Sequence, residues 1–178
     1  MSEKNRELII LVGMQGSGKT CYCQKFLPNY QRISQDEGLR TFGNVVSRLH
    51  ELLLEGAPKI VIDRTNPMRR QRKKFAEMAR AAGYFLKIIY FDVPEEICRE
   101  RIRNRKDHPT LSEDKMEQAI SDYKSRLNVP RAEECDKLVV VGAFGEPKNA
   151  EAAISNHPHP AESDSESQPG SESLNPNS

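Results

Sequence analysis

The chain has 178 residues, of which 37% are hydrophobic, and its formal net charge at pH 7 is +1. This length suits one domain with a full hydrophobic core, or a shorter domain that carries a tail. No apolar run approaches the roughly 18 residues of a membrane span, and the N-terminal SEKNRE lacks a signal-peptide layout. The four cysteines show neither CxxC spacing nor a secreted disulfide pattern, so we expect a cytoplasmic protein with reduced thiols and no membrane contact.

Short apolar runs that favour β-structure alternate with helical patterns along the chain. The strands are predicted at residues 8–12, 31–34, 59–63, 85–93 and 137–141. Strands separated by helices pair in parallel through crossover connections, and their near-continuous hydrophobicity is typical of strands covered on both faces. The sequence therefore predicts an α/β fold with an open, parallel, five-stranded sheet and helices on both faces.

The first predicted strand runs directly into GMQGSGKT, residues 13–20, which satisfies G-x-x-x-x-G-K-[ST] between a strand and a helix. Glycines in such a loop let several backbone N–H groups reach a phosphate chain, and the start of the helix adds free donors. Lys19 then reaches the β and γ phosphates, and the Thr20 hydroxyl can bind Mg²⁺. The pattern predicts a P-loop NTPase that binds ATP and Mg²⁺. Its nucleotide-binding residues are Gly13, Gln15, Gly16, Ser17, Gly18, Lys19 and Thr20.

Acidic residues follow the second and third predicted strands. Asp36 and Glu37 come shortly after residues 31–34, and Asp63 closes the strand at 59–63. Ligands of open α/β sheets bind at the carboxyl ends of the strands, so Asp36 or Glu37 can face the site; the alternative is a solvated turn. Asp63 stands where a Walker-B carboxylate would stand and is a candidate metal ligand, against the alternative of a helix-capping or loop acid.

A helix is predicted over residues 67–82, with Asn66 as its cap and Pro67 in its first turn. Opposite its apolar stripe lie the basic residues Arg69, Arg70, Arg72, Lys73 and Lys74. Such a face is either an ordinary solvated helix surface or a contact for the phosphates of a nucleic acid.

A further helix is predicted to begin after Pro94, and it carries Arg101 and Arg105 one helical turn apart without acids at the matching offsets. A bound polyanion would relieve the repulsion between these two arginines, although both can also be simply solvated. The KDHPT segment that follows has the composition of a loop, which makes Arg105 a candidate lid residue. The next helix is predicted from Glu113 to Leu127.

From Gly145 onward the composition turns to Ser, Pro, Glu, Asn and Gly. Such a segment has too few apolar side chains to form a core. We therefore expect a folded P-loop domain over residues 1–144 and a disordered acidic tail over residues 145–178.

Taken in chain order, GMQGSGKT, SQDE, DRTNP before a basic helix, and YFDVPEEICRERIRNR resemble the P-loop 5'-hydroxyl polynucleotide kinases. The match covers about residues 7–141. The resemblance implies a kinase domain with the P-loop strand central in the sheet, which transfers the γ-phosphate of ATP to the 5'-OH end of DNA or RNA. It also implies a place in nucleic acid repair, with nucleic acid ends as the partner.

The resemblance implies roles for individual residues. Asp36 matches the general base of the family, Lys19 and Thr20 match its nucleotide and metal residues, and Arg101 and Arg105 match its lid arginines.

The acceptor side of the site departs from the family pattern. Thr65 and Asn66 match the T-N pair near the acceptor strand, but Leu39 stands where an arginine often holds the acceptor's phosphate. Arg40 follows one position later, and Arg64 replaces a residue that is commonly small or acidic. These two arginines are our candidates for the acceptor contact.

Two other functions fit the same residues. One is a P-loop kinase for a hydroxyl on a sugar, a nucleotide sugar, an antibiotic or a charged tRNA. The other is an NTP-binding switch or adaptor without acceptor chemistry. The sequence predicts no oligomeric state.

Overall fold

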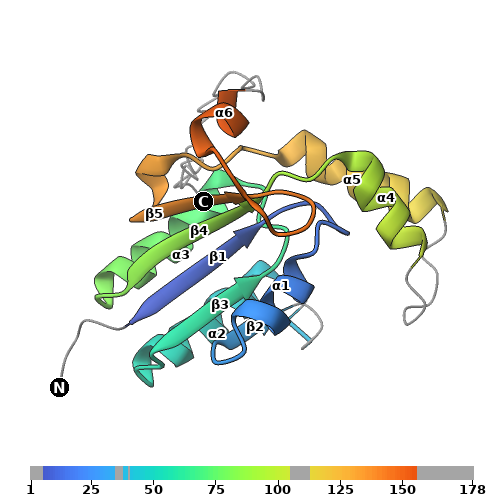
Figure 1. The fold of residues 1–178 in the computed structure, drawn as a ribbon. Coiled ribbons are helices and arrows are strands. Elements are labelled where there is room, and N and C mark those ends of the chain that lie inside the picture. The colour runs from blue at the N-terminus through green and yellow to red at the C-terminus, as the bar shows by residue number, and fades with distance from the viewer. Residues whose placement is uncertain (1–5, 35–37, 40, 105–112, 156–178) are drawn as a thin grey trace, which may run out of the picture.

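A mixed sheet with helices on both faces forms the centre of the structure, a computed structural model that describes residues 6–34, 38–39, 41–104 and 113–155 (Figure 1). The strands are β1 (Glu7–Val12), β2 (Gln31–Ser34), β3 (Lys59–Asp63), β4 (Phe85–Phe91), β5 (Lys137–Val141) and β6 (Pro147–Lys148). The helices are α1 (Lys19–Phe26), α2 (Phe42–Leu54), α3 (Arg69–Ala81), α4 (Glu95–Arg103), α5 (Glu113–Arg126), the 3₁₀ helix η3 (Ala132–Glu134) and α6 (Ala150–Ser155).

The strand order is β2-β3-β1-β4-β5-β6, so the strand that leads into GMQGSGKT is flanked by β3 and β4, as the resemblance implied. Strands β1 to β5 pair in parallel. Parallel neighbours need long crossover connections, and the segments that contain the helices supply them. The carboxyl ends of β1, β2 and β3 therefore meet at one edge of the sheet. That edge carries the P-loop, Ser34 and Asp63.

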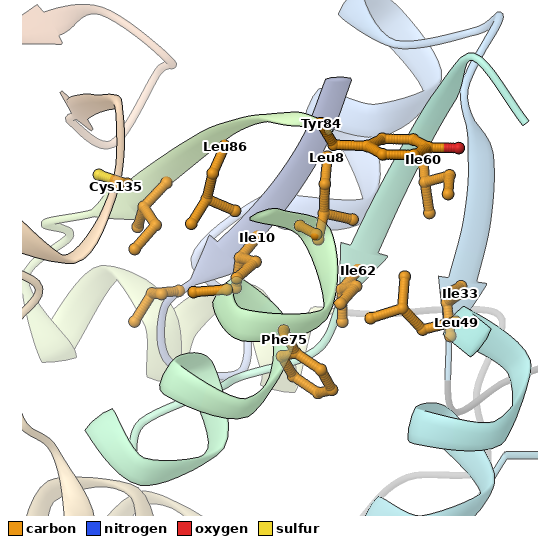
Figure 2. Close-up of a cluster of buried hydrophobic side chains, with 14 of the residues drawn as sticks. Leu8, Ile10, Ile33, Leu49, Ile60, Ile62, Phe75, Tyr84, Leu86 and Cys135 are labelled. Carbon is orange, nitrogen blue, oxygen red and sulfur yellow. The ribbon is translucent and has the colours of Figure 1, made fainter. Parts of the chain in front are cut away.

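The two faces of the sheet have separate cores because successive side chains of a strand point in opposite directions. On one face, Leu8 and Ile10 of β1 pack with side chains of α2 and α3 such as Leu49 and Phe75 (Figure 2). On the other face, Ile9 of β1 packs with residues of neighbouring strands and of α1. A third cluster joins Met14 of the P-loop to α4 and α5, which lie together beyond the sheet (Figure 1).

The prediction of five strands and of a tail from Gly145 was wrong at the C-terminal side. The chain reverses after β5, where Gly142 N–H donates to the Glu146 carbonyl at 2.8 Å, and β6 pairs antiparallel with β5. Helix α6 follows and buries Ala153 in the core. A two-residue strand and a six-residue helix are too short to show periodicity, so composition alone misassigned them. Residues 156–178 of the predicted tail lie outside the described residues.

The predicted basic face of α3 was wrong at one position, Arg72, whose side chain is 1% exposed. All its nitrogen atoms are engaged: it donates to both carboxylate oxygens of Glu134 at 2.9 and 3.0 Å. It also donates to the backbone oxygens of Asn66, Pro67 and Asn128. Arg72 therefore ties the start of α3 to η3 and to the segment after α5.

Replacing Arg72 with Ala should lower the free energy of unfolding by about 3 to 5 kcal/mol, because the buried Glu134 carboxylate and three backbone oxygens would lose their partner. Lys73→Ala, on the exposed face of the same helix, is the matched control and should change stability by less than about 0.5 kcal/mol. Chemical denaturation followed by circular dichroism measures both. Equal, small effects for the two variants would contradict a structural role for Arg72.

Candidate active site

The P-loop connects β1 to α1 and owes its shape to its glycines. Gly16 and Gly18 have φ values of 80° and 97°, a conformation that L-amino acids with a side chain rarely adopt. At Gly16, a Cβ would lie 2.5 Å from the carbonyl oxygen of Cys98 in α4. At Gly13, it would lie 2.8 Å from Cβ of Phe91. The loop therefore requires glycine for its backbone conformation and for its close contact with neighbouring elements.

The loop presents donors for an anion. Helix α1 starts at Lys19 after Gly18, and because glycine has no side chain, the cap residue makes no side-chain hydrogen bond to the first turn. The first N–H groups of a helix are donors that suit an anion. The Lys19 ammonium is buried and donates to the carbonyl oxygens of Gly13 and Met14 at 2.9 and 2.7 Å. The predicted phosphate-binding residues are thus brought together.

A cavity of about 150 Å³ lies between the P-loop and the ends of β2 and β3. It is lined by Gln15, Gly16, Gly18, Lys19, Thr20, Arg32, Ser34, Asp63, Arg64 and Thr65. The Thr20 hydroxyl donates to Oδ2 of Asp63 at 3.1 Å, which unites the two predicted metal ligands. A hydroxyl and a carboxylate oxygen are the ligands that Mg²⁺ prefers beside phosphates, so these residues fit that ion.

Gln15, another predicted nucleotide-binding residue, lies on the same wall. Its side-chain oxygen Oε1 is buried and has no hydrogen-bond partner in the part of the chain that the structure describes. A buried acceptor without a donor is costly, so a ligand or a water molecule is the expected partner.

Arg64, Thr65 and Asn66, which follow β3, were predicted to contact the acceptor. In the structure Arg64 and Thr65 line the cavity, whereas Asn66 does not. Asn66 was also predicted to cap α3, but the cap position is Met68. Asn66 is buried with φ 43°, and its amide donates to the Leu11 carbonyl at 2.8 Å. The Thr65 carbonyl accepts from Gly13 N–H at 3.1 Å. The side chain of Asn66 thus holds β1 and the P-loop in place and does not face the cavity.

Arg64 stays on the cavity wall, as an acceptor contact requires. Burial lowers the pKa of its guanidinium, because desolvation disfavours the charged form. Within the described residues no carboxylate forms an ion pair with Arg64. An anionic ligand is therefore the group that would offset its desolvation.

Arg101 reaches a second, larger cavity of about 730 Å³ on the other side of the P-loop. Its guanidinium donates to the carbonyl oxygens of Gly16, at 3.4 Å, and of Ala143, and it lies 5.9 Å from the ring centre of Phe144. Tyr22 of α1 lines the same cavity. Arg101 therefore joins α4, the P-loop and the turn after β5.

Sequence reasoning missed the 143–145 turn as part of this wall. Phe144 is 88% exposed, although it is a large apolar residue, and its N–H donates to the Glu146 carboxylate at 2.7 Å. The signal in the sequence was an aromatic residue between two glycines, in GAFG, directly after the last long strand. An exposed ring beside a P-loop offers a stacking surface for a planar base.

Three predicted site residues, Asp36, Arg40 and Arg105, lie outside the described residues. The nearest described residue before Asp36 is Ser34, which ends β2 opposite Asp63 and lines the smaller cavity. The roles assigned to Asp36, Arg40 and Arg105 stay predictions.

The cysteine side chains near the site are thiols. Burial raises the pKa of Cys23 to about 12, and the nearby Asp63 carboxylate acts in the same direction.

In the described part of the chain no group of three or more His, Cys, Asp or Glu residues is placed to bind a metal ion. None of the described helices combines the length and hydrophobicity needed to cross a bilayer.

A family model described as "AAA domain" matches residues 8–130, which is more than half of the chain and includes every described residue of the smaller cavity. The chain belongs to this AAA-domain family. Its fold is that of P-loop kinases. It is also 29% identical over 139 residues to the bifunctional polynucleotide phosphatase/kinase of Schizosaccharomyces pombe, a match that covers 74% of this chain. The chain spans about a third, 32%, of the length of that relative.

Solved structures with the same fold include kinases. A sugar kinase from Janibacter sp. HTCC2649 has a TM-score of 0.58 and 16% identity, over 84% of this chain and 91% of the other. The Mycobacterium tuberculosis APS kinase, solved with AMPPNP and APS, has a TM-score of 0.51 and 15% identity, over 76% of this chain and 88% of the other. At these identities the likeness concerns the fold.

The contact between Gly16 and α4 makes a specific prediction. Gly16→Ala should weaken binding of a fluorescent ATP analogue by at least about tenfold, because the new methyl group meets a backbone carbonyl and must displace the loop. Gly83→Ala is the matched control: it has a similar φ of 77°, but a Cβ there meets nothing within 4 Å. It should cost about 1 kcal/mol of stability and leave nucleotide binding unchanged. Equal binding by both variants would contradict the prediction.

Proposed function

We propose that this chain is a polynucleotide 5'-kinase that transfers the γ-phosphate of ATP to the 5'-OH end of DNA or RNA. The observation that carries the proposal is the smaller cavity, whose wall includes Arg64 together with Lys19, Thr20 and Asp63. Arg64, for which no carboxylate partner lies among the described residues, suits an acceptor that is itself a phosphate ester. The relative from S. pombe supports the same acceptor class.

The nucleotide side of the reaction uses the P-loop. Lys19 exchanges its loop carbonyls for the β and γ phosphates, and the N–H groups at the start of α1 hold the same phosphates. Gln15, whose buried side-chain oxygen has no hydrogen-bond partner among the described residues, lines this part of the site. Arg101 borders the larger cavity, where the base and sugar of ATP would lie against Phe144. Thr20 and Asp63 would hold Mg²⁺, which would neutralise charge on the phosphates.

The transfer itself is an in-line displacement. The 5'-oxygen of the acceptor forms a bond to the γ-phosphorus while the bond from that phosphorus to the β–γ bridging oxygen breaks, and ADP leaves. The proton of the acceptor hydroxyl passes to the Asp36 carboxylate, which acts as general base. Arg105, in the predicted lid, stabilises charge on the transferring group.

The acceptor side is proposed to use arginines and a basic surface. Arg64 contacts the first phosphate of the acceptor, and Thr65 lines the same cavity as Arg64. Arg40, a prediction from the sequence, supplies a second contact. Exposed Lys73 and Lys74 of α3 extend the basic surface for a longer strand. Arg72 does not belong to this surface, because it is buried against Glu134.

An acceptor panel tests the proposal. With labelled ATP, DNA and RNA oligonucleotides ending in 5'-OH should be phosphorylated, whereas matched oligonucleotides ending in 5'-phosphate should not. Sugars, gluconate, an aminoglycoside and charged tRNA serve as competing acceptors. Turnover of one of these with no oligonucleotide product would reject the polynucleotide acceptor and favour the small-molecule kinases that share the fold. ATP binding without any acceptor-dependent turnover would favour an NTP-binding switch.

Asp36 gives a separate prediction. Asp36→Ala should lower kcat for the accepted substrate by about 10²- to 10⁴-fold, the usual contribution of a general base, and leave the Kd for ATP within about twofold. Asp114→Ala, an exposed acid near the start of α5, is the control and should retain normal turnover. Rapid-quench measurement of a single turnover separates the chemical step from product release. Normal single-turnover rates for the Asp36 variant would remove Asp36 from the reaction.

A further inference from the structure

Asp63 is already paired with a positive side chain to which no role has been given, Arg32. Oxygen Oδ2 of Asp63 accepts from Arg32 Nε at 2.8 Å, from Arg32 Nη2 at 2.7 Å, and from the Thr20 hydroxyl at 3.1 Å. The Asp63 side chain is 3% exposed and the Arg32 side chain 27%. One edge of the guanidinium therefore binds a single carboxylate oxygen through two nitrogen atoms, and this is the same oxygen that meets Thr20.

The register of the sheet explains why Arg32 reaches this carboxylate. In the parallel pair of β2 and β3, Arg32 lies opposite Val61, and Ser34 lies opposite Asp63. Alternate residues share a face, so all four side chains lie on the face that α1 covers, where Val61 packs with Cys23. The Arg32 side chain is long enough to extend along the strand to Asp63. Because β2 is the edge strand, Arg32 can make this contact without being fully buried.

The ion pair between Arg32 and Asp63 changes the net charge that a divalent cation meets at the site. The carboxylate of Asp63 is neutralised by Arg32, and the positive charge of Lys19 lies in the same cavity. A cation that approaches Thr20 therefore meets a cavity lined by three positive side chains, Lys19, Arg32 and Arg64, and by one carboxylate that Arg32 compensates. The phosphates of a nucleotide supply the negative charge that is missing.

We propose that Arg32 is a positioning residue that holds Asp63 against Thr20 and cancels its charge, so that a divalent cation binds strongly only together with nucleotide phosphates. The inference rests on the proposed use of Thr20 and Asp63 for the metal, and it is independent of the acceptor. It makes Arg32 the residue that couples metal binding to nucleotide binding.

Binding of Mn²⁺ alone, measured by electron paramagnetic resonance on the full chain, tests this role. Arg32→Met removes the charge and keeps much of the side-chain volume, and it should strengthen Mn²⁺ binding in the absence of nucleotide by about tenfold or more. Arg48→Met removes an exposed arginine that pairs with Glu51 on α2, and it should leave Mn²⁺ binding unchanged. If Arg32→Met does not fold by circular dichroism, Arg32→Gln carries the same expectation.

A double-variant cycle shows whether Arg32 acts through Asp63. In an Asp63→Asn background, adding Arg32→Met should no longer strengthen Mn²⁺ binding. The factor by which ADP improves Mn²⁺ affinity should also be smaller for Arg32→Met than for the unmodified chain, because less of the metal affinity then depends on phosphates.

Two results would overturn the inference. One is Mn²⁺ binding to the Arg32 variants that is unchanged or weaker. The other is an equal gain with and without the Asp63 carboxylate, which would show that Arg32 acts on the metal directly. None of these measurements includes an acceptor, so a failed acceptor panel rejects the proposed polynucleotide substrate and leaves the role of Arg32 standing.

Discussion

The arrangement of the candidate site depends on the close approach of the Gly16 backbone to the carbonyl of Cys98. There is no space for a Cβ between the P-loop and α4. Helix α4 can lie so close only because glycine occupies that position, and this brings Arg101 within reach of the loop and of the turn after β5. The two cavities thus share the P-loop as a common wall.

Two positively charged side chains of the smaller cavity already have partners within the protein. Lys19 binds carbonyl oxygens of its own loop, and Arg32 binds Asp63. Burying a charge without partners is costly, so these pairs let the cavity exist without ligand. A nucleotide must then replace contacts that already exist, which favours a ligand with several negative charges over a singly charged one.

Residue type predicted correctly that some side chains lie close together, and it missed the partners of others. Thr20 and Asp63 were assigned to one metal site from their positions in two separate motifs, and the structure brings their oxygen atoms to 3.1 Å. Asn66 has the residue type of a helix cap, but its amide binds Leu11, 55 positions earlier in the chain. Helical periodicity placed Arg72 among solvated basic residues, although its partner Glu134 lies 62 positions away. Such distant partners leave no trace in local spacing.

The amino-acid sequence by itself determined the P-loop, the order of the main strands and helices along the chain, and hence a parallel sheet, whereas the place of β1 inside that sheet came from the family resemblance. These features depend on the conformational freedom of glycine and on hydrophobic periodicity within a few neighbouring residues. Only the tertiary structure decided which charged side chains are buried in pairs, that Asn66 supports the P-loop, and that Phe144 borders the larger cavity. The physical reason is that burial and ion pairing depend on which segments meet in space, and two-residue β6 and short α6 acquire their structure only from the sheet and core that they cover.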